Sequence, residues 1–163
     1  MIVIEKDFIP PQICEEMISL YNRNKRRMYK HDYSFPLHID DLSFQDKDDL
    51  KRLAFRHLAK CSSVYGDDIY LQSYEIVRWP KNSKKDFHYD SGMEDTCLAS
   101  ITYLNDGYRG GETLFEDDLS IKPCIGKTIF FDGNRYHHAV NRVAGGDRYT
   151  IAIWYTHNLL RAK

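Results

Sequence analysis

Apolar residues recur at helical spacing in the first part of the chain and at alternating spacing in the rest. Pro11 begins a stretch to about residue 28 in which apolar side chains return every three or four positions, which predicts a helix over 11–28. A second helix follows FPLHIDDLSFQDKDD and ends before Gly66. Its apolar stripe contains Leu50, Leu53, Ala54, His57 and Leu58, with His57 expected as a partly buried helix residue. The opening run MIVIE is typical of a strand.

From residue 68 the pattern changes to strands. Up to Pro80, Ile69, Leu71 and Val77 alternate against Tyr70, Tyr74 and Ile76, which predicts one long strand. Shorter candidates follow, separated by turns rich in Gly, Asn and Asp: 96–105, 111–116, 119–122, 127–131, 136–143 and 148–156. Many short strands at near-regular intervals indicate a sandwich or barrel, here with two helices packed against one sheet.

The length of the chain indicates a single domain, and its balanced charge argues against general attraction of nucleic acid or of an anionic membrane. The 163 residues fit one domain, with helical support over about 1–66 and a β-barrel over about 67–157. Because 23 Lys and Arg balance 24 Asp and Glu, no overall field attracts nucleic acid or an anionic membrane. We interpret the basic run Arg23, Lys25, Arg26 and Arg27 as the end of the first helix, opposite Glu15 and Glu16 near its start, where the helix dipole favours each sign.

Targeting and redox features are few. The N-terminus lacks the basic start of a signal peptide, and no apolar run approaches the ~18 residues of a spanning helix. The cysteines Cys14, Cys61, Cys97 and Cys124 have no CxxC spacing and are expected to be reduced thiols, although two disulfides in a secreted protein are the alternative. We therefore expect a monomeric cytoplasmic protein.

The stretch DFHYDSG at 86–92 places His88 and Asp90 two residues apart. In an extended strand, residues i and i+2 point to the same face, so these side chains can converge on one metal ion. His38 and Asp40 have the same spacing, but they lie in the polar approach to the second helix, where Asp40 suits a turn or cap. Chance alone also produces such pairs, so a third ligand is needed.

His138 offers that ligand at the start of a strand-like run. Two histidines and one carboxylate on one face of a metal leave open positions, the arrangement of non-haem Fe(II) oxygenases, whereas zinc would nearly complete its tetrahedron with them. Arg148 follows His138 by ten residues, and its guanidinium fork can hold a carboxylate such as the far end of 2-oxoglutarate.

Five motifs in order resemble the prolyl 4-hydroxylase family of Fe(II)- and 2-oxoglutarate-dependent dioxygenases. They are HYD at 88–90, ITYLND at 101–106, GGETLFED at 110–117, GKTIFFDG at 126–133 and HAVNRVAGGDRYTIAIW at 138–154. The resemblance covers roughly residues 68–156. It implies a double-stranded β-helix, a jelly-roll barrel backed by the N-terminal helices, that holds iron and cosubstrate in its mouth.

The resemblance also implies roles for individual residues. His88, Asp90 and His138 would bind iron, and Arg148 would pair with the far carboxylate of 2-oxoglutarate. Strand alternation puts His137 and His138 on opposite faces without deciding which is inside; the family spacing selects His138. Tyr103 matches a tyrosine that assists the same carboxylate, or is an ordinary core aromatic. Trp154 matches an aromatic near the target residue, or packs in the core.

Two positions depart from the family pattern. Collagen-type relatives carry Lys where this chain has Arg148, so the oxygen-sensing and bacterial or viral-like prolyl hydroxylases are more similar. Those often have Tyr before the Pro that precedes the HxD segment, where this chain has Trp79. An indole N–H still donates a hydrogen bond, but a cosubstrate role at Trp79 is then open.

The implied reaction is hydroxylation of a prolyl residue in a protein or peptide by O2 and 2-oxoglutarate, with release of succinate and CO2 and with ascorbate as reductant. The polar segment PKNSKKD at 80–86 would be a mobile loop closing over the polypeptide, or a plain solvated loop. One alternative is the same chemistry on a lysyl residue, a nucleobase or a small metabolite. A second is a jelly-roll module that binds a metal or a sugar without turnover, against which Arg148 argues.

Overall fold

Two antiparallel sheets make up most of the chain. The structure is a computed structural model that describes residues 1–90 and 94–163, so Ser91 and Gly92 of the DFHYDSG stretch lie outside the described residues.

The larger sheet has the strand order β1-β9-β5-β12-β3-β2. Its strands are Val3–Glu5 (β1), Phe35–His38 (β2), Tyr70–Trp79 (β3), Thr96–Tyr103 (β5), Thr128–Phe131 (β9) and Arg148–Thr156 (β12). The smaller has the order β4-β10-β7-β8, formed by Lys85–His88 (β4), Thr113–Phe115 (β7), Ser120–Ile121 (β8) and His138–Val140 (β10). Arg109–Gly110 (β6) pairs with Val143–Ala144 (β11).

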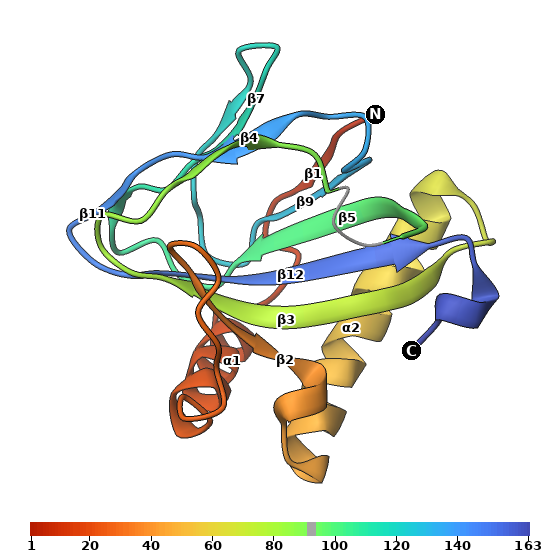
Figure 1. Cartoon of the computed structure of the whole chain (residues 1–163), viewed down its shortest axis with the longest axis horizontal. Helices are drawn as coiled ribbons and strands as arrows, with labels where there is room; N and C mark the ends of the chain where they lie inside the picture. The colour runs from red at the N-terminus through yellow and green to blue at the C-terminus, as the bar shows by residue number, and fades with distance from the viewer. Residues whose placement is uncertain (91–93) are drawn as a thin grey trace.

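The helices lie on one side of the larger sheet and the smaller sheet lies on the other (Figure 1). They are α1 (Pro11–Arg23) and α2 (Phe44–Tyr65). Two short 3-10 helices are also present: η1 (Ile39–Asp41) directly before α2 and η2 (Leu159–Arg161) after β12. This arrangement confirms the predicted fold class, mostly β with helices backing one sheet. Within the described residues, no helix combines the length and the apolarity needed to cross a membrane. All four cysteines are free, as expected.

Strand alternation gives the larger sheet two separate apolar layers. Ile151, Ile153 and Tyr155 of β12 pack against the helices in the main core, while a second cluster lies between the two sheets and contains Ala99, Tyr103, Phe115, Ile121, Ile129 and Phe131. His57 of α2 is fully buried in the helix-side layer rather than partly buried as predicted. Its Nδ1 donates to the Leu53 carbonyl and its Nε2 lies 2.7 Å from Thr102 Oγ1, so it links α2 to β5.

The predicted bounds of both helices need correction. The first helix ends at Arg23 rather than 28, because Asn24 caps it: the Asn24 backbone N–H and Nδ2 both donate to the Leu20 carbonyl. Of the basic run, only Arg23 lies in the last turn, and no acidic residue lies in the first turn, so the dipole interpretation holds for Arg23 alone. The second helix begins at Phe44, earlier than predicted, because Ser43 is its N-cap.

Several strand predictions also need correction. The segment around residues 35–38, interpreted as a polar approach to the second helix, is the edge strand β2, whose pairing with β3 no local pattern reveals. In β3 the predicted alternation is wrong, since a register shift opposite Trp154 and Tyr155 puts Leu71 and Ile76 in the same helix-side core. The expected strand 136–143 is divided into β10 and β11.

The segment 80–86 is not a free loop in this structure. Its last two residues belong to β4, and hydrogen bonds join the Asn82 N–H to the Val143 carbonyl and the Val143 N–H to the Ser83 carbonyl. The predicted closure over a polypeptide therefore has no support in the packing of this segment.

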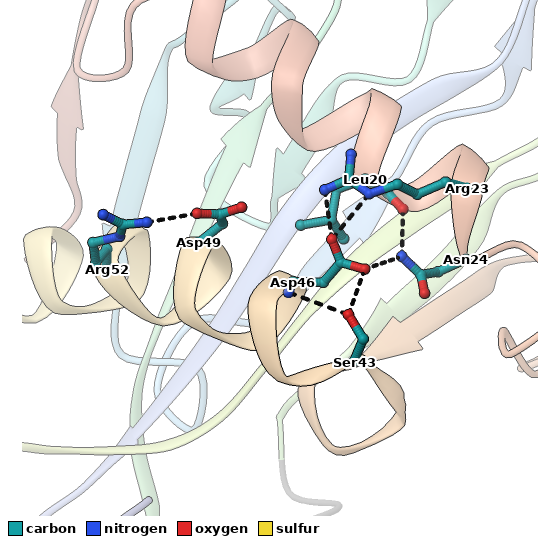
Figure 2. A network of polar contacts seen from close by, with 7 residues as sticks. All are labelled: Leu20, Arg23, Asn24, Ser43, Asp46, Asp49 and Arg52. Atoms are coloured by element: carbon teal, nitrogen blue, oxygen red, sulfur yellow. Dashed lines mark hydrogen bonds and ion pairs between the residues drawn. The ribbon is translucent and has the colours of Figure 1, made fainter.

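A buried carboxylate joins the two helices. Figure 2 shows Asp46 of α2 accepting hydrogen bonds from Arg23 Nε at 2.9 Å, Asn24 Nδ2 at 2.9 Å and Ser43 Oγ at 2.9 Å. Burial raises the pKa of Asp46, but the hydrogen bonds from Arg23, Asn24 and Ser43 outweigh it, so the pKa lies below its ordinary value. The α1 C-terminus and the α2 N-terminus thus share one anion.

We expect Asp46→Ala to lower the free energy of unfolding by about 2–3 kcal/mol, because three donors lose a charged acceptor. The nearby Asp49 pairs with Arg52 at a more exposed position (Figure 2), so Asp49→Ala is the control and should cost less than ~1 kcal/mol. Because the folded pKa of Asp46 is lowered, its contribution is present at neutral pH and is lost as the pH falls through that pKa. Urea unfolding at neutral and acidic pH measures both effects; equal losses in the two variants would contradict the assignment.

Candidate active site

Three side chains converge on one point between the sheets. His138 of β10 pairs directly with His88 of the neighbouring antiparallel strand β4, so both imidazoles point to the same face. Asp90 lies two residues after His88, and its backbone N–H donates to the Gly133 carbonyl at 2.9 Å. One nitrogen or oxygen atom from each of the three residues lies within 4.8 Å of the others. The expected His-Asp-His cluster is therefore present in the structure.

Backbone carbonyls fix the tautomer of both histidines. His88 Nδ1 lies 2.9 Å from the Asp86 carbonyl and His138 Nδ1 lies 2.9 Å from the Tyr136 carbonyl. Because a carbonyl only accepts, each Nδ1 carries the hydrogen and each Nε2 keeps its lone pair. These Nε2 atoms lie 4.0 Å and 3.7 Å from Asp90 Oδ1. Such a backbone contact on the far nitrogen is the usual support of a metal-binding histidine.

The cluster is partly buried, with His138 the most buried of the three residues, and burial favours neutral imidazoles. Burial, and the charge of the neighbouring His138, lower the pKa of His88. Burial lowers the pKa of His138 to about 4. Burial also raises the pKa of Asp90 to about 6, against the lowering effects of His88 and of a hydrogen bond from the Trp154 side chain. At neutral pH the two neutral nitrogens and the carboxylate are in the forms that bind a divalent cation.

Trp154 and Gly133 both border Asp90. Trp154 of β12 lines the cavity with it and lowers its pKa. On the other side lies Gly133, where an added Cβ would come within 2.3 Å of Asp90 Oδ2. Only a residue without a side chain leaves Asp90 in this position. Trp154 borders the cluster, and it also packs against the apolar core between the sheets.

Arg148 lies at the other end of the same cavity. It is the first residue of β12, it is 1 % exposed, and its guanidinium stacks between the rings of Trp79 and Tyr103, each 5.3 Å away. Its Nε and Nη2 atoms are buried without a hydrogen-bond partner, and within the described chain it forms no ion pair. A buried guanidinium is costly unless an anion satisfies it. The arrangement is that of a carboxylate-binding site, and it fits a dicarboxylate cosubstrate.

Two tyrosines contact Arg148 differently. The Tyr103 hydroxyl lies 2.7 Å from Thr113 Oγ1 and 3.1 Å from the Ile121 carbonyl, and it accepts from the Thr113 N–H. Its ring, not its hydroxyl, faces the guanidinium. Tyr108, by contrast, has a buried hydroxyl without a partner, and its ring lies beside the Arg148 stem over Gly111, where a Cβ would meet both side chains within 3.0 Å. Trp79 Nε1 is buried without a partner as well.

The alternative histidines do not join the metal cluster. His137 points to the opposite face of β10, where it contacts Glu116 and stacks on Tyr89 with ring centroids 4.5 Å apart. His38 is the N-cap of η1: its Nδ1 accepts from the Asp40 N–H at 3.1 Å, and Asp40 pairs with Lys163. Neither His137 nor the His38 and Asp40 pair belongs to the cluster.

The cluster and Arg148 line one cavity of about 660 Å³. Glu75 of β3 lines this cavity, and Tyr108 lies beside Arg148; neither was identified as a functional residue from the sequence. Tyr108 lies in a turn, where no periodicity marks it. Glu75 had a signal, since it is the one charged residue in the otherwise uncharged strand stretch YLQSYEIV.

Comparison with known proteins supports the same chemistry. Residues 73–156 match the model of the 2OG-Fe(II) oxygenase superfamily. A curated relative, prolyl 3-hydroxylase 2 of Rattus norvegicus, is 35% identical over 65 residues, which cover 36% of this chain and 9% of the relative. The match therefore spans only a small part of that protein's length.

Solved structures confirm the double-stranded β-helix. An oxidoreductase of the 2OG-Fe(II) oxygenase family from Burkholderia pseudomallei has a TM-score of 0.81 at 16% identity, covering 96% of this chain and 84% of that one. A prolyl hydroxylase from Trichoplax adhaerens, solved with a hypoxia inducible factor peptide fragment, has a TM-score of 0.80 at 16% identity, covering 96% and 83%. With more than half of its residues matched by the family model, the chain belongs to the 2OG-Fe(II) oxygenase superfamily.

Proposed function

We propose that this protein is an Fe(II)- and 2-oxoglutarate-dependent dioxygenase that hydroxylates a prolyl residue in a protein or peptide. The observation that carries the proposal is the His88, Asp90 and His138 cluster in one cavity with the unpaired guanidinium of Arg148. The prolyl target is supported by the similarity to prolyl 3-hydroxylase 2 and to a prolyl hydroxylase that binds a peptide. Similar proteins include both a prolyl 3-hydroxylase and a prolyl 4-hydroxylase. Analysis of the product is therefore the measurement that identifies the ring carbon that is hydroxylated.

The residues divide the work between two ends of the cavity. His88 Nε2, His138 Nε2 and a carboxylate oxygen of Asp90 would bind Fe(II), and the Arg148 guanidinium would hold a carboxylate of 2-oxoglutarate. With iron and 2-oxoglutarate bound, O2 would be the oxidant: one of its atoms enters succinate as 2-oxoglutarate loses CO2, and the other enters the substrate as a hydroxyl group. Trp154 borders Asp90 in the cavity, and the rings of Trp79 and Tyr103 orient Arg148 and keep water from it. Cytoplasmic location and a monomeric state stay predictions.

The central test is turnover in air with Fe(II), 2-oxoglutarate, ascorbate and proline-containing peptides. Succinate release together with a +16 Da proline is expected for the natural protein. His138→Ala and Asp90→Ala should abolish both by opening the metal site, while the matched variants His137→Ala and Asp40→Ala should retain a substantial part. Activity that survives in His138→Ala and disappears in His137→Ala would reverse the assignment of the faces of β10.

Gly133 gives a second test that needs no turnover. Gly133→Ala should weaken binding of Fe(II) or Ni(II) by at least ~10-fold, about 1.4 kcal/mol, because the new methyl group displaces Asp90. Gly107→Ala is the control, since a Cβ there meets nothing within 4 Å. Isothermal titration calorimetry measures both affinities, and circular dichroism checks the fold. Equal metal affinity in the two variants would show that Asp90 is not a ligand.

The carboxylate end has its own test. Arg148→Lys keeps the charge but loses the planar fork, so the affinity of the metal-loaded protein for 2-oxoglutarate should fall at least ~10-fold. We expect Tyr108→Phe to lower it by up to ~10-fold through loss of a donor to the charged carboxylate. Tyr103→Phe should change it less than ~3-fold, since that hydroxyl is engaged with Thr113. The reverse order for the two tyrosines would restore the role that the resemblance implies for Tyr103.

A further inference from the structure

A buried carboxylate lines the cavity without a role in the chemistry above. Glu75 lies in the middle of β3, opposite Ala152 of β12 on one side and His38 of β2 on the other. Only 7% of its surface is exposed, and that surface belongs to the cavity that holds the metal cluster. The neighbouring cavity positions on β3 are Ser73 and Val77, so Glu75 is the acidic group of this wall.

Glu75 has little compensation for its burial. Within residues 1–90 and 94–163 its carboxylate accepts one hydrogen bond, from the Tyr29 hydroxyl at 3.2 Å, and forms no ion pair. Burial raises its pKa to about 7, against the lowering effect of the Tyr29 hydrogen bond. One oxygen of this carboxylate has no partner in the described part of the cavity. A cation bound there would stabilise the ionised carboxylate, which burial alone disfavours.

The cationic side chains of the cavity do not supply that charge. His38, directly across from Glu75, accepts at Nδ1 from the Asp40 N–H and contacts Ser73 Oγ at 2.9 Å through Nε2, so it carries one proton and no charge. Burial lowers its pKa as well. Lys85 forms an ion pair with Asp32, and His31 Nδ1 lies 4.0 Å from the same carboxylate.

Arg148 is too far along the sheet to neutralise Glu75. It pairs with Trp79, four residues beyond Glu75 on β3, which is roughly 13 Å at about 3.3 Å per residue. The cavity therefore has a cationic end at Arg148 and an anionic position at Glu75, with Tyr29 at its exposed rim. An anion is suited to the first and a cation to the second.

We infer that Glu75 and Tyr29 form a subsite for a basic group of the substrate, an amine or a guanidinium. The inference rests on the proposed function and names the substrate class of the same site. For a peptide substrate, it places a Lys or Arg residue close to the hydroxylated proline. The Glu75 carboxylate binds the cation, and the Tyr29 hydroxyl holds the carboxylate in place.

Ligand binding can be measured without turnover, because the only two tryptophans, Trp79 and Trp154, both line this cavity. Tryptophan fluorescence is followed while n-butylguanidinium is added, with n-butylurea as the neutral probe of nearly the same shape. We expect a saturable change with butylguanidinium and at least ~10-fold weaker binding of butylurea. Glu75→Gln should weaken butylguanidinium binding at least ~10-fold, whereas Glu16→Gln, on the exposed face of α1, should not. Equal binding of the two probes, or equal binding in Glu75→Gln, would overturn the inference.

Peptides separate this inference from the proposed function. Proline peptides with Lys or Arg at each flanking position are compared with norleucine and Gln peptides, by +16 Da product. Preference of at least ~10-fold in kcat/KM for one basic position, lost in Glu75→Gln, supports the subsite. Hydroxylation that ignores flanking charge overturns the subsite and leaves the prolyl function intact. If no proline is modified, the prolyl target fails, and the butylguanidinium titration alone decides the subsite.

Discussion

The antiparallel register between β10 and β4 is the constraint on which the candidate active site depends. It places His138 opposite His88, so two imidazoles from segments 50 positions apart in sequence face each other with ring centroids 4.4 Å apart. A shift of one residue would turn His137 inward and replace a buried, carbonyl-supported histidine by one whose Nδ1 is engaged with Glu116. Asp90 lies just beyond the end of β4, where its backbone N–H donates to the Gly133 carbonyl, and Gly133 leaves the space that its side chain occupies.

The cavity separates opposite charges along the strands of the larger sheet. Its cationic end combines a guanidinium with two aromatic rings, and the buried donors there, Arg148 Nε and Nη2 and Trp79 Nε1, have no protein acceptor. Its acidic position on β3 has a single donor. In a medium of low polarisability such unpaired groups select ligands by sign more strongly than exposed ones do. The polar groups that lack partners within the described chain therefore indicate the charge of the ligand groups that bind beside them.

Much of this organisation could be predicted from the sequence, and the remainder shows what local patterns lack. The HxD spacing and the ten-residue interval between His138 and Arg148 are local signals, whereas the choice of His138 over His137 came from the family spacing; together they predicted the residues that the structure brings together. The edge strand at 35–38 and the phase of β3 near Leu71 depend on pairing with distant strands, which periodicity does not encode. The end of α1 depends on Asn24 meeting Asp46, a contact between two helices. Tyr103 ends a strand and Tyr108 lies in a turn, and only packing shows which of the two hydroxyls is already engaged.

The alternation of β12 separates folding from specificity. Ile151, Ile153 and Tyr155 belong to the layer that the helices cover, whereas Thr150, Ala152 and Trp154 line the cavity. Every second position can therefore change its side chain while the intervening positions keep the protein folded. In such a strand, a single substitution at a cavity position can change which substrate binds while the core-facing residues, and with them most of the folding free energy, stay the same.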